Sequence, residues 1–241
     1  MSKTEIQEVT TMEVKNAHKK YHDLLTRKQL AKQGLIPTDK GVELWSNQYC
    51  QHSAIYYDPT KAIKLETVYV WKNYFKDDYY YTIVEVGAVD QLGNELFNKV
   101  VKPSREYLSQ PSNADSWLEV EKKHGFSTAD IILASSEKIV DRELVSLIKK
   151  QKYVKNLISY NTDFNLPNAL IKNKTYTQID LMEQFANLIK EPYKNYYGEK
   201  GYKWQKLEKF LDYYGVKLSS YRAVDYANAL RECYGKIKIK K

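Results

Sequence analysis

The sequence has few cysteines, no long apolar run and no secretory signal, the features typical of secreted and membrane proteins. Only two of its 241 residues are cysteines, Cys50 and Cys233, which excludes a disulfide scaffold and predicts a cytoplasmic location. No apolar run approaches the ~20 residues that a membrane-spanning helix needs. The segment MSKTEIQEVTTMEVK also lacks the apolar centre of a secretory signal. We therefore expect a soluble protein without a membrane partner.

Acidic side chains are fewer than basic ones. The sequence has 30 Asp and Glu against 38 Lys and Arg, a formal net charge of +8. Such an excess attracts polyanions such as nucleic acid, although it says nothing about the fold. Apolar residues make up 43% of the chain, which is enough for a folded core and excludes a disordered chain.

The pattern of apolar residues predicts two unequal parts with a boundary near Pro59. Residues 1–60 are expected to form an appended module, with a helix over 6–33 and a strand-like stretch over 42–57. Residues 61–241 are expected to form one mixed α/β domain. Its predicted strands are 62–70, 82–89, 95–101, 156–160 and 176–181, and its predicted helices are 141–150, 166–172, 182–190, 204–214 and 223–234. The last two helices are expected to end at Gly215 and Gly235.

Five segments, taken in this order, resemble the DnaQ-like (DEDDh) 3′–5′ exonucleases. They are TIVEVGAVDQLGNELFNKVVKP (82–103), HGFST (124–128), LISYNTDFNLPNAL (157–170), QIDL (178–181) and WQKLEKFLDYYGVKLSSYRAVDYANAL (204–230). The resemblance runs from about residue 62 to residue 234. It implies a ribonuclease H-like α/β fold, with a mixed five-stranded sheet flanked by helices and a small N-terminal helical and β appendage.

The resemblance also implies a site for two-metal cleavage of phosphodiester bonds, which needs several carboxylates around two divalent ions. Family members supply Asp-x-Glu on the first strand, an Asp in the second motif, and a His and an Asp in the third. In the first motif of this chain Glu66 is predicted to stand at the Glu position, and Lys64 at the Asp position. The ammonium of Lys64 would repel a metal ion there, and we expect it to pair with Glu66 or Asp225 instead.

The other two motifs depart from the family pattern as well. Asn165 stands at the Asp position of the second motif, and Tyr221 replaces the His of the third. Asp225 lies one residue before the position of the final Asp, which holds Tyr226. The catalytic set is thus reduced to Glu66 and Asp225 as vestigial carboxylates. We expect no cofactor, and Mg²⁺ or Mn²⁺ only if the protein is active.

Lysines cluster between residues 145 and 175, a segment that contains only one acidic residue, Asp163. They are predicted to bind phosphates, with low sequence preference, and are Lys149, Lys150, Lys152, Lys155, Lys172 and Lys174. A solvated face that keeps the protein soluble explains the same lysines equally well. The 22 tyrosines also gather in clusters, where exposed rings would stack on unpaired bases or anchor a protein interface.

A zinc site in the N-terminal module is the weaker alternative for its polar residues. His18 and His22 are four apart on the predicted helix, and Cys50 and His52 follow, so four side chains of zinc-binding type are present. The spacing matches no familiar zinc finger, and a solvated helix face with an unrelated cysteine explains it.

Three functions remain open from the sequence. The first is an inactive relative of the DnaQ-like exonucleases that binds single-stranded nucleic acid or a protein partner. The second is a working metal-dependent 3′–5′ exonuclease with rearranged ligands. The third is a protein-interaction factor of a phage or other mobile element that inhibits a host machine. The sequence leaves open whether DNA or RNA is bound, and the oligomeric state.

Overall fold

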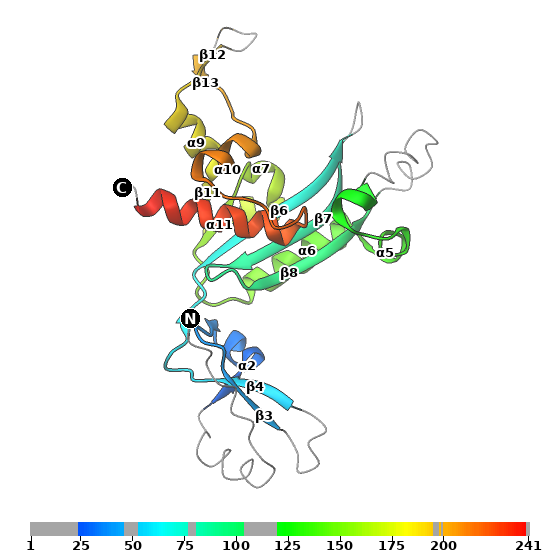
Figure 1. Ribbon diagram of the computed structural model, residues 1–241, viewed down its shortest axis with the longest axis vertical. Coiled ribbons are helices and arrows are strands. Elements are labelled where there is room, and N and C mark those ends of the chain that lie inside the picture. The colour runs from blue at the N-terminus through cyan, green and yellow to red at the C-terminus, as the bar shows by residue number, and fades with distance from the viewer. Residues whose placement is uncertain are drawn as a thin grey trace. The chain divides into compact units, whose positions relative to one another are not determined.

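A computed structural model describes residues 24–45, 53–76, 81–103, 120–194, 198 and 200–239 (Figure 1). The chain divides into two compact units. The first is Met1–Leu65 with Lys149–Tyr153, and the second is Glu66–Ile148 with Val154–Lys241. Within the described residues, no helix is both long and apolar enough to cross a membrane.

The first unit is built from short strands and one short helix. Its elements are β1 (Leu25–Thr26), α2 (Arg27–Lys32), β2 (Leu35–Ile36), β3 (Val42–Trp45), β4 (Ser53–Tyr57) and β5 (Ile63–Lys64). Strands β1, β4 and β3 form one antiparallel sheet, and β2 pairs with β5.

The described part of the helix predicted over 6–33 is confirmed for Arg27–Lys32, which form α2, whereas Leu25–Thr26 form β1 instead. The Thr26 hydroxyl accepts a hydrogen bond from the backbone N–H of Gln29, and the Gln29 side chain accepts one from the backbone N–H of Thr26. This reciprocal cap defines a helix start. Residues 6–23 lie outside the described residues, as do the candidate zinc ligands His18, His22, Cys50 and His52.

The second unit contains a six-stranded mixed sheet with the order β11-β10-β6-β7-β8-β9. An antiparallel meander of β6 (Thr67–Lys76), β7 (Tyr81–Asp90) and β8 (Glu95–Lys102) is joined by three parallel pairings. These are β10 (Asn156–Ser159) with β6, β11 (Thr177–Asp180) with β10, and the two-residue β9 (Ser135–Ser136) with β8. The predicted mixed sheet is confirmed, but it has six strands instead of the predicted five, because the short β9 adds one at the edge. Strand β6 is a central strand, between β10 and β7.

Helices cover the sheet and carry its connections. They are α5 (Thr128–Leu133), α6 (Glu137–Lys149), α7 (Thr162–Asn165), α8 (Asn168–Ile171), α9 (Leu181–Ile189), α10 (Leu207–Tyr214) and α11 (Ala223–Ile239). Helix α11 crosses one face of the sheet over β6 and β7, and α6 lies behind the sheet in the same view (Figure 1). A two-stranded hairpin of β12 (Pro192–Lys194) and β13 (Lys200–Tyr202) connects α9 to α10.

The first strand of the sheet lies further along the chain than the sequence predicted. Residues 62–70 were the expected strand, whereas β6 covers Thr67–Lys76. The sequence pattern fails here because Lys72 and Asn73 resemble loop residues, yet they are only 3% and 4% exposed. Both are paired with side chains far away in the sequence, and such pairing is what allows polar groups to be buried.

The last helix is longer than predicted. Gly215 ends α10 with the left-handed backbone (φ 60°) that the sequence predicted. Gly235 does not end α11, which continues to Ile239. The extra turn is held because Lys236 Nζ donates to the Tyr214 carbonyl oxygen at 2.6 Å and Ile237 packs against the apolar core.

Candidate functional site

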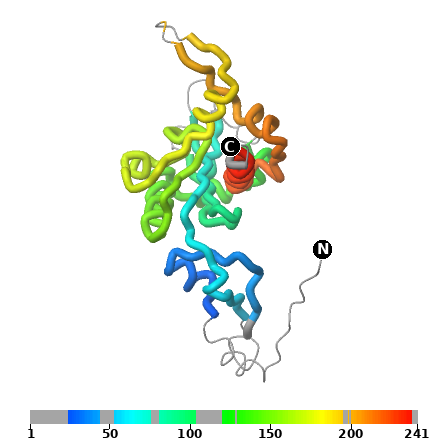
Figure 2. Tube along the Cα trace, turned by 90° about the vertical axis from the view of Figure 1, so that its left-hand side faces the viewer, coloured from blue at the N-terminus to red at the C-terminus, as the bar shows by residue number. Residues whose placement is uncertain are grey.

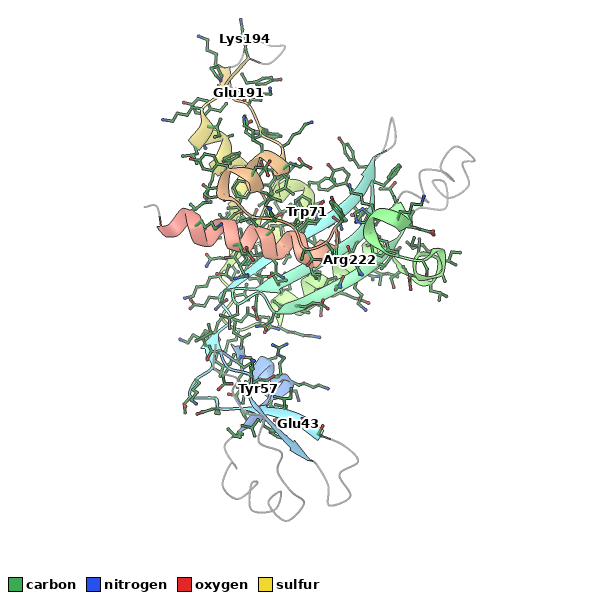
Figure 3. The ribbon with its side chains drawn as sticks, in the orientation of Figure 1. Glu43, Tyr57, Trp71, Glu191, Lys194 and Arg222 are labelled. Carbon is green, nitrogen blue, oxygen red and sulfur yellow. The ribbon has the colours of Figure 1, made fainter. Side chains whose placement is uncertain are left out.

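The side chains of β6 alternate between the two faces of the sheet, as strand geometry requires. Trp71 and Asn73 point to the face that α11 covers, and the indole Nε1–H of Trp71 donates to Asn73 Oδ1 at 2.8 Å. The Trp71 ring stacks on Tyr226 of α11, with ring centroids 4.9 Å apart and planes inclined by 21°. Figure 3 shows Trp71 and Arg222 near the start of this helix. Two aromatic rings therefore fill the space between the central strand and the third-motif helix.

Asn73 is the centre of a buried hydrogen-bond network. Its amide nitrogen donates to Glu85 Oε2 at 2.9 Å and to the carbonyl oxygen of Tyr221 at 2.8 Å. That carbonyl also lies 2.7 Å from Nδ1 of His124. A carbonyl oxygen only accepts, so Nδ1 of His124 carries the proton. Burial lowers the pKa of His124 and so favours this neutral form.

Glu85 of β7 is fully buried and fixes the beginning of α11. One carboxylate oxygen accepts from Arg222 Nε at 2.7 Å, and the other accepts from the backbone N–H of Ala223 at 2.6 Å. Burial raises the pKa of Glu85, and the bonds from Ala223, Arg222 and Asn73 oppose that shift. A carboxylate at a helix N-terminus satisfies free N–H groups and the helix dipole.

Gly87 allows α11 to approach β7 closely. A Cβ atom at this position would lie 2.5 Å from the backbone nitrogen of Val224 and 2.6 Å from the carbonyl carbon of Ala223. A larger residue would therefore push the helix away from Glu85. The site face is closed by direct packing of helix backbone on strand backbone.

Lys72 lies on the opposite face of β6 and pairs with α6. Its ammonium is 3.1 Å from Glu137 Oε1 and 2.9 Å from Asp141 Oδ1. Its side chain is only 4% exposed. A buried ammonium is tolerated when two carboxylates share its charge, so this ion pair fastens α6 to the sheet.

Asn165, the residue predicted at the second-motif Asp position, also has its side-chain oxygen and nitrogen in hydrogen bonds. Its Oδ1 accepts from the backbone N–H of Lys72 at 2.7 Å, and its Nδ2 donates to the carbonyl oxygens of Tyr160 at 2.5 Å and Asn161 at 3.1 Å. The side chain is 1% exposed. Asn165 therefore acts as a clamp between α7 and β6, and offers no free oxygen to a ligand.

Lys64 and Glu66 do not lie on the central strand. Lys64 belongs to β5, which pairs with β2 in the first unit, and its ammonium lies 5.1 Å from the centre of the Tyr153 ring. Glu66 precedes β6, and its carboxylate is 3.5 Å from Lys155 Nζ. The expected placement of these two residues in the first motif is corrected, because β6 begins only at Thr67. The ion pair within the site is Arg222 with Glu85.

The two predicted third-motif residues lie near the start of α11. Tyr221 contributes its carbonyl oxygen to the network, while its ring is 50% exposed and lies 5.6 Å from the ammonium of Lys123. Asp225 accepts hydrogen bonds from the hydroxyls of Ser219, at 2.6 Å, and Ser220. Asp225 thus closes the loop before α11.

The six lysines predicted to bind phosphates are all exposed. Lys149, Lys150 and Lys152 belong to the first unit, whereas Lys155, Lys172 and Lys174 belong to the second. Their binding of nucleic acid stays a prediction.

Sequence reasoning missed most of the side chains that form this network. Trp71, Asn73, Glu85, His124 and Arg222 all contribute to it, from β6, β7 and the segments before α5 and α11. The available signal was the run VYVWKNYF, in which two polar residues interrupt an otherwise apolar strand.

These residues do not fit two divalent ions. Mg²⁺ and Mn²⁺ prefer carboxylate and other oxygen ligands, and this network offers one carboxylate, Glu85, whose oxygens already accept three hydrogen bonds. Over the described part of the chain, no group of three or more His, Cys, Asp and Glu side chains is placed to hold a metal ion.

Comparison with known proteins identifies two similar solved structures. The crystal structure of cell-death related nuclease 4 (CRN-4) has a TM-score of 0.48 and 14% identity, over 72% of this chain and 64% of that one, less than two thirds of its length. The crystal structure of a full-length 3′-exonuclease has a TM-score of 0.48 and 13% identity, over 72% and 81%. No family model matches the chain, and neither does any curated protein. The mixed six-stranded sheet flanked by helices is consistent with the ribonuclease H-like fold that the motif segments predict.

Proposed function

We propose that this nuclease-fold protein has lost hydrolysis and binds single-stranded nucleic acid. The observation that carries the proposal is the stacking of Trp71 on Tyr226. Trp71 and Asn73 have the spacing of the Asp-x-Glu pair, lie on the central strand, and face the third-motif helix. We therefore assign them to the first-motif positions, and Tyr226 to that of the final Asp. Neutral side chains then occupy these positions, together with Asn165.

The binding part of the proposal rests on charge. The chain carries a net charge of +8, and six exposed lysines lie between residues 145 and 175. Lysines bind phosphates as mobile point charges, so such binding depends strongly on salt and weakly on sequence. A fold whose carboxylate cluster is replaced by neutral groups also lacks the negative charge that would repel a phosphate backbone.

The test is incubation with end-labelled single-stranded DNA and RNA, with Mn²⁺ and separately with EDTA. We expect the protein to bind both the single-stranded DNA and the single-stranded RNA, and to digest neither above background. Digestion that EDTA stops, and that Glu85→Gln or Asp225→Asn abolishes, would instead identify an active exonuclease with rearranged ligands. Absence of binding at about 50 mM salt, where electrostatic contacts are strong, would favour a protein partner.

A further inference from the structure

The hairpin of β12 and β13 extends away from α9 and α10, and both views show it as an arm of the second unit (Figures 1 and 2). All six residues of its two strands are exposed. A two-stranded hairpin without a covering layer is only marginally stable in water. The arm therefore needs a firm base, and its exposed faces are available to a partner.

The base of the arm is fixed by Glu191. Its carboxylate accepts from Lys203 Nζ at 2.9 Å and from Gln205 Nε2 at 3.0 Å, and Lys209 lies 3.5 Å away. The hydrogen bonds from Lys203 and Gln205 lower the pKa of Glu191 to about 2, so it stays charged at neutral pH. The buried hydroxyl of Tyr160 donates to the Gln205 carbonyl oxygen at 2.7 Å and joins this base to the core.

The cross-strand register places like charges opposite each other. Lys194 pairs with Lys200, and directly opposed like charges destabilise a hairpin. Neither side chain forms an ion pair with the described residues. Figure 3 places Lys194 beyond Glu191, toward the outer part of the arm. A negatively charged partner would remove this repulsion, which favours a polyanion over a neutral protein surface.

Aromatic rings flank these lysines. Tyr193, Tyr202 and Trp204 are 52%, 44% and 68% exposed. Tyr193 lies opposite Gly201, and a Cβ atom at Gly201 would meet nothing within 4 Å. The space beside the Tyr193 ring is therefore open to a flat group. Single-stranded nucleic acid combines the two features that the arm would match, a phosphate chain and unpaired bases.

We propose that the β12–β13 arm binds single-stranded nucleic acid. The rings of Tyr193, Tyr202 and Trp204 stack on bases, while Lys194 and Lys200 contact phosphates. This inference rests on the proposed function, and it names the β12–β13 arm as the segment of the chain that contacts the bases. Because the rings read no base edge, the arm has little sequence preference, and the 2′-hydroxyl of RNA is not required for stacking.

The test compares two double variants of the full chain for binding to labelled single-stranded dT and U oligonucleotides. Tyr193→Leu/Trp204→Leu removes both rings, and Tyr193→Phe/Trp204→Phe is the matched control that keeps them. Stacking is worth about 1–3 kcal/mol per base, so we expect the leucine variant to bind at least about tenfold more weakly. The phenylalanine variant should stay close to wild type.

An abasic oligonucleotide of equal length separates stacking from charge. The wild type should bind the abasic oligonucleotide more weakly than dT. The leucine variant should bind the abasic oligonucleotide and dT with equal affinity. Equal binding of dT by the wild type and the leucine variant would overturn the proposal that the arm binds nucleic acid, and would leave the proposed function intact. No binding by the wild type overturns both. Equal losses in the leucine and phenylalanine variants would indicate a structural role and also overturn the arm.

Discussion

At the level of single residues, the main feature of the second unit is that two charged side chains are buried. Lys72 and Glu85 are each almost completely removed from water, on opposite faces of the sheet. An isolated buried charge is costly, whereas a paired one with further hydrogen bonds is tolerated. Lys72 has Glu137 and Asp141, and Glu85 has Arg222 and two N–H donors. These residues therefore act as fasteners between the sheet and its helices.

Glu85→Gln is expected to lower the free energy of unfolding by about 1–3 kcal/mol, the usual cost of weakening a buried charged hydrogen bond. Glutamine still accepts from Ala223 but loses the charge that holds Arg222. Urea unfolding measures the change. The matched control is Glu143→Gln, whose carboxylate is 3.9 Å from Lys99 and 47% exposed. The control should change stability by less than about 0.5 kcal/mol. Equal effects of the two substitutions would contradict the fastening role.

His124 gives the protein a pH dependence with a definite sign. Burial lowers its pKa in the folded state, whereas the unfolded chain keeps the ordinary value of 6.5. Below pH 6.5 the unfolded state binds more protons, so the free energy of unfolding falls as the pH falls toward the folded-state pKa. Above pH 6.5 this contribution to stability is fully present.

The measurement is urea unfolding of wild type and His124→Asn between about pH 7.5 and pH 5.5. The other three histidines are common to both proteins, so the difference between the two slopes reports His124. We expect the variant to lose less stability on acidification. Parallel curves would show that His124 is not held neutral by its burial.

At the level of elements, local patterns predicted the type of most strands and helices and failed where distant contacts decide. The strands 82–89 and 95–101 were predicted because apolar residues and a Gly-Asn turn mark them. The central strand β6 was misplaced because the partners that bury Lys72 come from α6, 65 and 69 residues away. The arm was missed because both its faces are exposed and no alternation marks it.

Gly215 and Gly235 were both predicted to end a helix, and substituting each by alanine tests which of them does. Gly215 has a left-handed backbone, whereas Gly235 lies inside α11 and a Cβ atom there meets nothing within 4 Å. Gly235→Ala should therefore raise the free energy of unfolding by about 0.5–1 kcal/mol. Gly215→Ala should lower it by about 1–2 kcal/mol. Thermal and urea unfolding of the pair check the signs. A loss of stability in Gly235→Ala would mean that the helix ends where the sequence pattern had suggested.

At the level of the whole molecule, the sequence predicted which motif positions have lost their carboxylates, and the structure moves the central strand away from Lys64 and Glu66. Asn165 and Tyr226 were assigned from the spacing within their own motifs, which needs no knowledge of the rest of the chain, and that assignment stays a prediction. The first motif could not be placed that way, because Trp71 and Asn73, which we propose for the Asp-x-Glu positions, include no charged residue to recognise. Our proposal for these two positions rests on the packing of β6 against α11.

The charge of the whole chain leads to the final prediction, which concerns salt. Each phosphate contact on a single strand adds about 0.7 to the slope of log binding constant against log salt concentration. Lys172 and Lys174 are exposed lysines of the second unit. Lys172→Gln/Lys174→Gln should therefore flatten the slope by about 1.4 if both contact phosphates.

Fluorescence anisotropy with a labelled single strand measures that slope. Lys99→Gln is the control, since its ammonium lies 3.9 Å from Glu143 and outside the lysine cluster. The control should leave the slope unchanged, because a lysine that contacts no phosphate releases no counterion on binding. If the double variant binds with the wild-type slope, these lysines serve solubility and not binding. The phosphate contacts must then come from other basic residues, and the two arm lysines would be the next to substitute.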